Sequence, residues 1–173
     1  MRKATLILSL AALLAVNTSA KAESNHTFSA GYASNDFLNS KGFNTKYIYD
    51  NSDLPVGWAG SFTSTWNEQD MGFSKMKFNY YSLTTGPALR VADFVTLYAL
   101  AGASKGQLSY SHSDAKSDTY GFTWGLGVQV DLIQNLVLDA GYERSSLAPR
   151  KSYDKDDKRT QMNVWTVGVG YRF

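Results

Sequence analysis

Residues 119–130, TYGFTWGLGVQV, alternate completely between two kinds of side chain over twelve positions. A period of two predicts a β-strand, and a strand in a soluble protein usually runs for only about 5–6 residues. One face carries glycine, threonine and glutamine, while the other carries bulky apolar side chains: Tyr120, Phe122, Trp124, Leu126, Val128 and Val130. This combination is typical of a strand that turns its bulky face to lipid and its small face to a narrow barrel interior.

Seven further segments show the same alternation, at 27–34, 42–50, 56–66, 80–90, 95–104, 136–145 and 164–173. Short turns are predicted at 51–55, 91–93 and 131–135, and longer polar loops at about 35–41, 67–76, 106–118 and 147–159. An even number of strands with alternately short and long connections predicts an all-β, eight-stranded antiparallel up-and-down transmembrane β-barrel with periplasmic termini. Pro87 predicts a bulge in its strand, because proline cannot donate a hydrogen bond to a neighbouring strand.

The N-terminus has the layout of a secretory signal peptide. Arg2 and Lys3 precede an apolar run at 4–16, and Ala20 and Ala22 give the small-residue spacing of a cleavage site. The run is shorter than the roughly 20 residues that cross a bilayer as a helix. We therefore expect residues 1–22 to be removed and 23–173 to form the barrel, in the bacterial outer membrane.

The expected mature chain is nearly neutral, with 14 of the 17 basic residues remaining against 15 acidic ones. This balance gives no general attraction to nucleic acid. The chain contains no cysteine, so no disulfide can stabilise it outside the cytoplasm, and a surrounding bilayer is the alternative source of stability.

The chain ends on a strand pattern rather than on a polar tail. Tyr171 and Phe173 share the apolar face of the last segment. An aromatic final residue resembles the signal that the outer-membrane barrel assembly machinery reads, and an ordered last strand is needed because an open edge in lipid leaves backbone groups unpaired. We predict that these two residues form this assembly signal.

Several segments, in this order, resemble the Ail/Lom/OmpX family of outer-membrane proteins over essentially the whole mature chain: GFNTKYIY, GSFT, YYSLTTGPALR, YGFTWGLGVQ, NLVLDAGYERS and GVGYRF. The resemblance implies an eight-stranded barrel with extracellular loops. Members of that family include adhesins and serum-resistance factors that bind matrix proteins or complement regulators, and others have no settled role. The loops depart most from the family, so the resemblance supports the barrel more than any binding activity.

The interior of an eight-stranded barrel is just wide enough to be filled by side chains. A network of inward-facing charges is predicted there, because an isolated buried charge is unfavourable: Lys46, Arg90, Asp139, Glu143 and Arg172. Asp139 and Glu143 could instead form a catalytic carboxylate pair, although we favour ion pairing. A filled interior predicts a plugged barrel without pore activity.

Two polar loops contain candidate binding residues. Met71, Phe73 and Met76 could anchor a partner, or they could pack against an extended strand or lipopolysaccharide. The loop at 148–159 carries cations that could contact lipid A phosphates or a sulfated or acidic partner, or could remain solvated: Arg150, Lys151, Lys155 and Lys158.

An enzyme is not expected. Ser111, His112, Ser113 and Asp114 are neighbours in one loop, whereas a nucleophile and its base must converge in space. Spacings for a metal, a phosphate loop or nucleic acid are not found, so no cofactor is expected. We predict a monomeric adhesin or complement-evasion protein. The alternatives are a structural envelope protein that contacts lipopolysaccharide only and a lipid-modifying outer-membrane enzyme.

Overall fold

The computed structural model describes residues 26–50, 56–70, 75–110, 116–133, 135–149 and 160–173. Its strands are β1 (His26–Asn35), β2 (Ser40–Tyr49), β3 (Val56–Asp70), β4 (Lys75–Ala92), β5 (Val95–Tyr110), β6 (Lys116–Ile133), β7 (Leu136–Pro149) and β8 (Thr160–Arg172). A single 3₁₀ turn, η1 (Phe37–Asn39), joins β1 to β2. Within these described ranges, no helix has the length and apolar character needed to cross a membrane.

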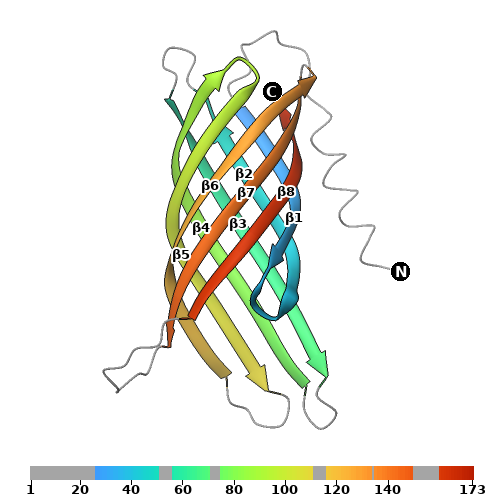
Figure 1. Cartoon of the computed structure of the whole chain (residues 1–173), viewed down its shortest axis with the longest axis vertical. Coiled ribbons are helices and arrows are strands. Elements are labelled where there is room, and N and C mark those ends of the chain that lie inside the picture. Colours follow the sequence, from blue (N-terminus) through green and yellow to red (C-terminus); the bar gives the residue numbers. More distant parts are fainter. Residues whose placement is uncertain (1–25, 51–55, 71–74, 111–115, 134, 150–159) are drawn as a thin grey trace.

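Each strand pairs antiparallel with the next one along the chain, and β8 pairs with β1 to close a barrel (Figure 1). The closing register runs from Thr27 opposite Arg172 to Asn35 opposite Val164. The eight-stranded antiparallel up-and-down barrel predicted from the sequence is therefore confirmed. We call the end of the barrel that holds the β1–β2 turn the extracellular end, as the sequence predicts. The opposite end is the periplasmic end.

The alternating pattern sorts side chains to the two sides of the wall. In β6, Phe122 and Leu126 are 60% and 55% exposed, whereas Thr123 between them is completely buried. The other strands repeat this arrangement, so apolar side chains cover the outside, while the inside holds mostly polar side chains together with two buried apolar clusters. This is the reverse of a soluble protein and is the arrangement that a lipid surrounding requires.

The strands extend further toward the extracellular end than the sequence pattern predicts. Strand continues into each predicted loop: over 67–70 and 75–76, over 106–110 and 116–118, and over 147–149, while the remaining residues of these loops lie outside the described ranges. Polar side chains pair across these extensions: Glu68 lies 3.6 Å from Lys77, and Lys105 lies 3.1 Å from Asp118. The loop prediction was wrong at these positions. Outward side chains no longer need to be apolar beyond the lipid, so the alternation ends there, while backbone pairing between the strands continues.

The expected bulge at Pro87 is absent. Thr85 lies opposite Ala101 and Ala88 opposite Tyr98, so the register of β4 against β5 is the same on both sides of Pro87. Gly86 and Pro87 are not paired with residues of β5, and the register does not change across them. The proline therefore does not need an N–H donor toward β5. A register shift occurs only nearer the end of β4, between Arg90 and Ala92.

The extracellular end of the barrel is lopsided. Strands β1 and β2 have 10 residues each, whereas β4 and β6 have 18. The pairing of β2 with β3 ends at Lys41 opposite Trp66, but that of β3 with β4 continues to Asp70 opposite Lys75. Figure 1 shows the β1–β2 hairpin ending short of the other strands. Strands β3–β8 therefore form a sheet that projects beyond this hairpin.

Candidate functional site

An ion pair lies across the middle of the barrel interior. The Nζ atom of Lys46 in β2 is 2.5 Å from Oδ1 of Asp139 in β7, and both side chains are 2% exposed. Lys46 also donates to the hydroxyl of Tyr98, and Nε2 of Gln129 donates to Oδ2 of Asp139 at 2.9 Å. These contacts join four strands across the lumen. Additional hydrogen bonds of this kind are what make a buried ion pair tolerable.

Two glycines make room for this cluster. A Cβ atom added at Gly141 would lie 2.8 Å from the hydroxyl oxygens of both Tyr98 and Thr166. One added at Gly127 would overlap the Tyr98 hydroxyl group. The phenol ring can lie over the neighbouring strands β6 and β7 only because they carry no side chain at these two positions.

Glu143 lies on the same inward face of β7 but has different partners. Its carboxylate accepts hydrogen bonds from Ser82 at 2.8 Å, Thr63 at 3.0 Å and Ser61 at 3.4 Å. Among the described residues it makes no salt bridge, so the expected pairing with a cation does not occur; short hydroxyl side chains of β3 and β4 fill the space beside it. Asp139 and Glu143 thus share no partner, and the structure does not bring them together as a catalytic pair.

The periplasmic end of the interior holds two arginines and two aspartates. Arg90 lies 3.4 Å from Asp50 and 2.9 Å from Asp131, and Arg172 lies 3.4 Å and 3.1 Å from the same two carboxylates. Burial raises the pKa of Asp50, and the neighbouring Arg90 guanidinium lowers it by a smaller amount. Sequence reasoning missed Asp131 because its segment, DLIQN, has the composition of a turn.

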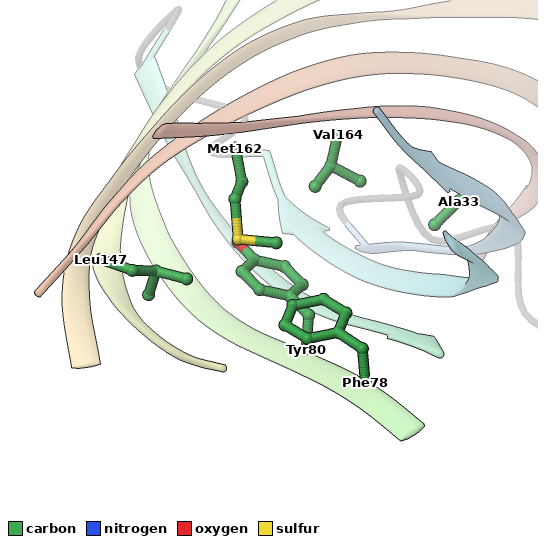
Figure 2. Close-up of a cluster of buried hydrophobic side chains, with 6 residues drawn as sticks. All are labelled: Ala33, Phe78, Tyr80, Leu147, Met162 and Val164. Atoms are coloured by element: carbon green, nitrogen blue, oxygen red, sulfur yellow. The ribbon is translucent and has the colours of Figure 1, made fainter. Parts of the chain in front are cut away.

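The extracellular end of the interior is apolar. Figure 2 shows the buried cluster there, formed by Ala33, Phe78, Tyr80, Leu147, Met162 and Val164. Phe37 of η1 packs against it, with its ring centroid 5.1 Å from that of Phe78. Sequence reasoning did not find this layer, because Phe78 precedes the predicted strand and Met162 lies in no predicted element.

Hydrogen bonds tie the tip of the β1–β2 hairpin to β8. The Asp36 carboxylate accepts from the backbone N–H of Asn163 at 2.9 Å and from its side-chain Nδ2 at 2.6 Å. The N–H of Asp36 donates to the Asn163 carbonyl at 3.1 Å. Tyr142 donates to Oδ1 of Asn163 at 2.7 Å. The short hairpin is thereby attached to the base of the projecting sheet.

The C-terminal residue lies at the seam that closes the barrel. The backbones of Phe173 and His26 exchange two hydrogen bonds, at 2.9 and 3.2 Å, and their ring centroids are 5.8 Å apart. Tyr171 lies opposite Phe28 of β1 and Leu136 of β7. The last strand is therefore paired on both sides up to its end. Recognition of Tyr171 and Phe173 by an assembly machinery stays a prediction.

Most of the predicted binding residues lie outside the described residues. This holds for Met71 and Phe73, for the neighbours 111–114, and for the cations Arg150, Lys151, Lys155 and Lys158. The backbone of Met76 belongs to β4, opposite Gln69 and Tyr110, so this residue lies in a strand rather than in a loop.

The chain is similar to outer-membrane proteins over its full length. The sequence model of the family described as "Outer membrane protein beta-barrel domain" matches residues 8–173. Outer membrane protein X of Enterobacter cloacae is 33% identical over 182 residues, covering 100% of both chains. The attachment invasion locus protein of Yersinia enterocolitica is 34% identical over 189 residues, again covering 100% of both. The virulence membrane protein PagC of Salmonella typhimurium is 35% identical, covering 93% of this chain and 92% of PagC.

Solved structures agree with these sequence relationships. The crystal structure of Ail, the attachment invasion locus protein of Yersinia pestis, matches with a TM-score of 0.72 and 33% identity, covering 86% of this chain and 97% of Ail. A crystal structure of the same protein in complex with the heparin analogue sucrose octasulfate matches with a TM-score of 0.73 and 30% identity over the same shares.

Proposed function

The chain belongs to the outer membrane β-barrel family that includes outer membrane protein X and the attachment invasion locus proteins, and we propose that its extracellular end attaches to host surface or matrix proteins or captures complement regulators. The protein is a multi-pass protein of the bacterial outer membrane. Two relatives support this proposal by their names. One is the attachment invasion locus protein, and the other is the virulence membrane protein PagC.

The projecting sheet is the observation that carries this proposal. A barrel needs strands only long enough to cross the lipid, about 9–11 residues. The 18 residues of β4 and β6 exceed this length, and the ion pair between Glu68 and Lys77 lies in one of the extensions. A rigid sheet beyond the membrane can present its loops to a partner.

The proposed contacts are the two loops identified in the sequence. Met71 and Phe73, between β3 and β4, and Met76, the second residue of β4, supply apolar anchors of the kind that dominate many interfaces. The cations of the connection between β7 and β8 supply charge for sulfate, phosphate or carboxylate groups: Arg150, Lys151, Lys155 and Lys158. The heparin analogue bound by Yersinia pestis Ail supports a sulfated ligand for this second group.

Binding can be tested with the refolded protein in lipid nanodiscs against matrix proteins, complement regulators and heparin. We expect saturable binding to at least one of them. One variant carries Met71→Ser, Phe73→Ser and Met76→Ser; the other carries glutamine at the four cationic positions. Loss of a hot-spot anchor should weaken affinity at least about tenfold, or about 1.4 kcal/mol.

The two variants also separate the outcomes. Loss in the apolar variant alone places the partner at the β3–β4 connection, and loss in the cationic variant alone indicates a sulfated or acidic ligand. If the wild-type protein binds none of the tested molecules, the attachment proposal fails, and a structural role with lipopolysaccharide as the only external partner replaces it.

A further inference from the structure

The charges of the described side chains inside the barrel do not balance. Lys46 pairs with Asp139, and the two arginines at the periplasmic end pair with the two aspartates beside them. Glu143 is one more carboxylate in the same lumen, and within the described part of the chain it has no cationic partner, although it is only 4% exposed. A buried charge without a counter-charge is strongly unfavourable. The missing positive charge is therefore expected to come from something that the barrel binds.

The hydrogen bonds around Glu143 are those of an ionised carboxylate. Nδ2 of Asn44 donates to Oγ of Ser61 at 2.8 Å and to Oγ1 of Thr63 at 2.9 Å. Because each of these hydroxyls already accepts a hydrogen bond, its own hydrogen is free to be donated to Oε1 of Glu143. Ser82 donates to Oε2. Three donors thus converge on a group that only accepts when it is ionised, so a cation balances the charge without disturbing these bonds, whereas a proton would compete with them.

Two further hydroxyl groups lie on the strands that supply these donors. The Oγ1 atoms of Thr65 and Thr84 are buried and have no hydrogen-bond partner among the described residues. Thr84 lies opposite Ser61 in the pairing of β3 with β4, and Thr65 follows Thr63 on the inward face of β3. A buried polar atom without a partner costs free energy, and oxygen atoms are the ligands that hard cations prefer. These hydroxyls therefore offer free lone pairs close to the unbalanced carboxylate.

The set of ligands indicates which cation fits. The oxygens around Glu143 are neutral hydroxyls, and the described residues include no group of three or more histidine, cysteine or acidic side chains that could hold a metal ion. Oxygen ligands favour hard ions over transition metals. One negative charge balances a monovalent ion, whereas a divalent ion would leave a buried positive charge. We propose that Glu143, with the hydroxyls of Ser82 and Thr84, binds one alkali-metal ion, Na⁺ or K⁺, inside the barrel.

Unfolding by urea in detergent micelles tests the proposal when Na⁺ or K⁺ is replaced stepwise by choline at constant ionic strength. We expect the unfolding equilibrium constant to fall by up to about tenfold for each tenfold rise in alkali-ion concentration above the dissociation constant, because the ion binds the folded state only. Glu143→Gln should abolish this dependence. Thr84→Val removes one oxygen at similar volume and should shift the dependence to about fivefold higher concentration. Glu68→Gln removes an exposed carboxylate and should leave it unchanged.

Crystals of the wild-type protein soaked in thallium(I) acetate locate the ion without any variant. The expected result is anomalous density between Glu143 and Thr84, and crystals without it would overturn the proposal. The same conclusion follows if choline and alkali ions give one unfolding curve, or if the dependence persists in Glu143→Gln. A ¹³C chemical shift of the Glu143 carboxyl group typical of a protonated acid, measured in the presence of Na⁺, would make a proton the counter-charge instead. None of these results depends on host attachment.

Discussion

The interior residues show both what alternation can predict and what it cannot. Period two assigns Lys46 and Asp139 to the inward face, because the side of a strand follows from parity alone. Their pairing depends on how β2 and β7 are staggered around the barrel, which no local pattern encodes. For the same reason the sequence did not reveal that Glu143 would lie among hydroxyl groups or that Asp131 would join the arginines.

The ion pair of Lys46 and Asp139 should matter most when one partner is removed. Asp139→Ala leaves the Lys46 ammonium buried without a counter-ion, and breaking a buried pair in this way typically lowers the free energy of unfolding by about 3–5 kcal/mol. Urea unfolding in detergent micelles, followed by tryptophan fluorescence, measures the change. The double variant Lys46→Met, Asp139→Leu should recover most of the loss. A single variant as stable as the wild type would contradict this description of the interior.

Two glycine substitutions form a matched pair. Gly141→Ala forces the Tyr98 hydroxyl to move and should destabilise the barrel by about 1–3 kcal/mol, as overpacking does. Gly60→Ala adds the same methyl group where it touches nothing, and its effect should stay within about 0.5 kcal/mol. The same unfolding assay compares them, and equal effects would mean that space around the glycines does not decide their role.

At the scale of elements, the sequence predicts every strand but not the extent of each. All eight segments with period two are strands, because in lipid the outward face must be apolar throughout. Beyond the lipid this requirement ends, and polar extensions such as the one containing Glu68 and Lys77 are indistinguishable from loops by composition. Pro87 was misjudged because a pattern cannot show that a ladder may omit one donor without changing register.

The hairpin of β1 and β2 should depend on its tether to β8. Asp36→Ala removes two hydrogen bonds to Asn163, and we expect the Asn163 amide to exchange with solvent roughly fivefold faster, equivalent to about 1 kcal/mol of local opening. Hydrogen exchange followed by NMR in nanodiscs measures this, with Lys41→Ala as an exposed control on the same hairpin. Unchanged exchange at Asn163 would show that the tether does not hold the tip.

At the scale of the whole molecule, three layers fill the lumen. The arginines and aspartates occupy the periplasmic end, the polar side chains around Lys46 and Glu143 the middle, and the apolar cluster with Phe78 the extracellular end. Filling by charge could be predicted from the sequence, whereas the apolar layer required the three-dimensional register. Because these side chains occupy the lumen, a partner would contact the outer surface of the barrel.

This filling predicts that the barrel does not conduct ions. Purified protein reconstituted in planar bilayers at 1 M KCl should give no stepwise conductance above the lipid background, because side chains of the described strands occupy the narrow lumen. A variant with Phe37→Ala and Phe78→Ala removes part of the apolar layer but leaves the charged layers, and it should also remain closed. Regular conductance steps from the wild-type protein would contradict a plugged interior.

Attachment of the bacterium to host surfaces through the extracellular end of this barrel is the function that we propose. The most direct measurement expresses the protein in a non-adherent bacterium and counts cells that remain on surfaces coated with matrix proteins or heparin. Surface exposure is verified by protease cleavage on intact cells. We expect increased attachment by wild-type cells and a return to background with the Met71→Ser, Phe73→Ser, Met76→Ser variant or the cationic-loop variant. Wild-type cells that expose the protein yet attach no better than cells without it would contradict the account.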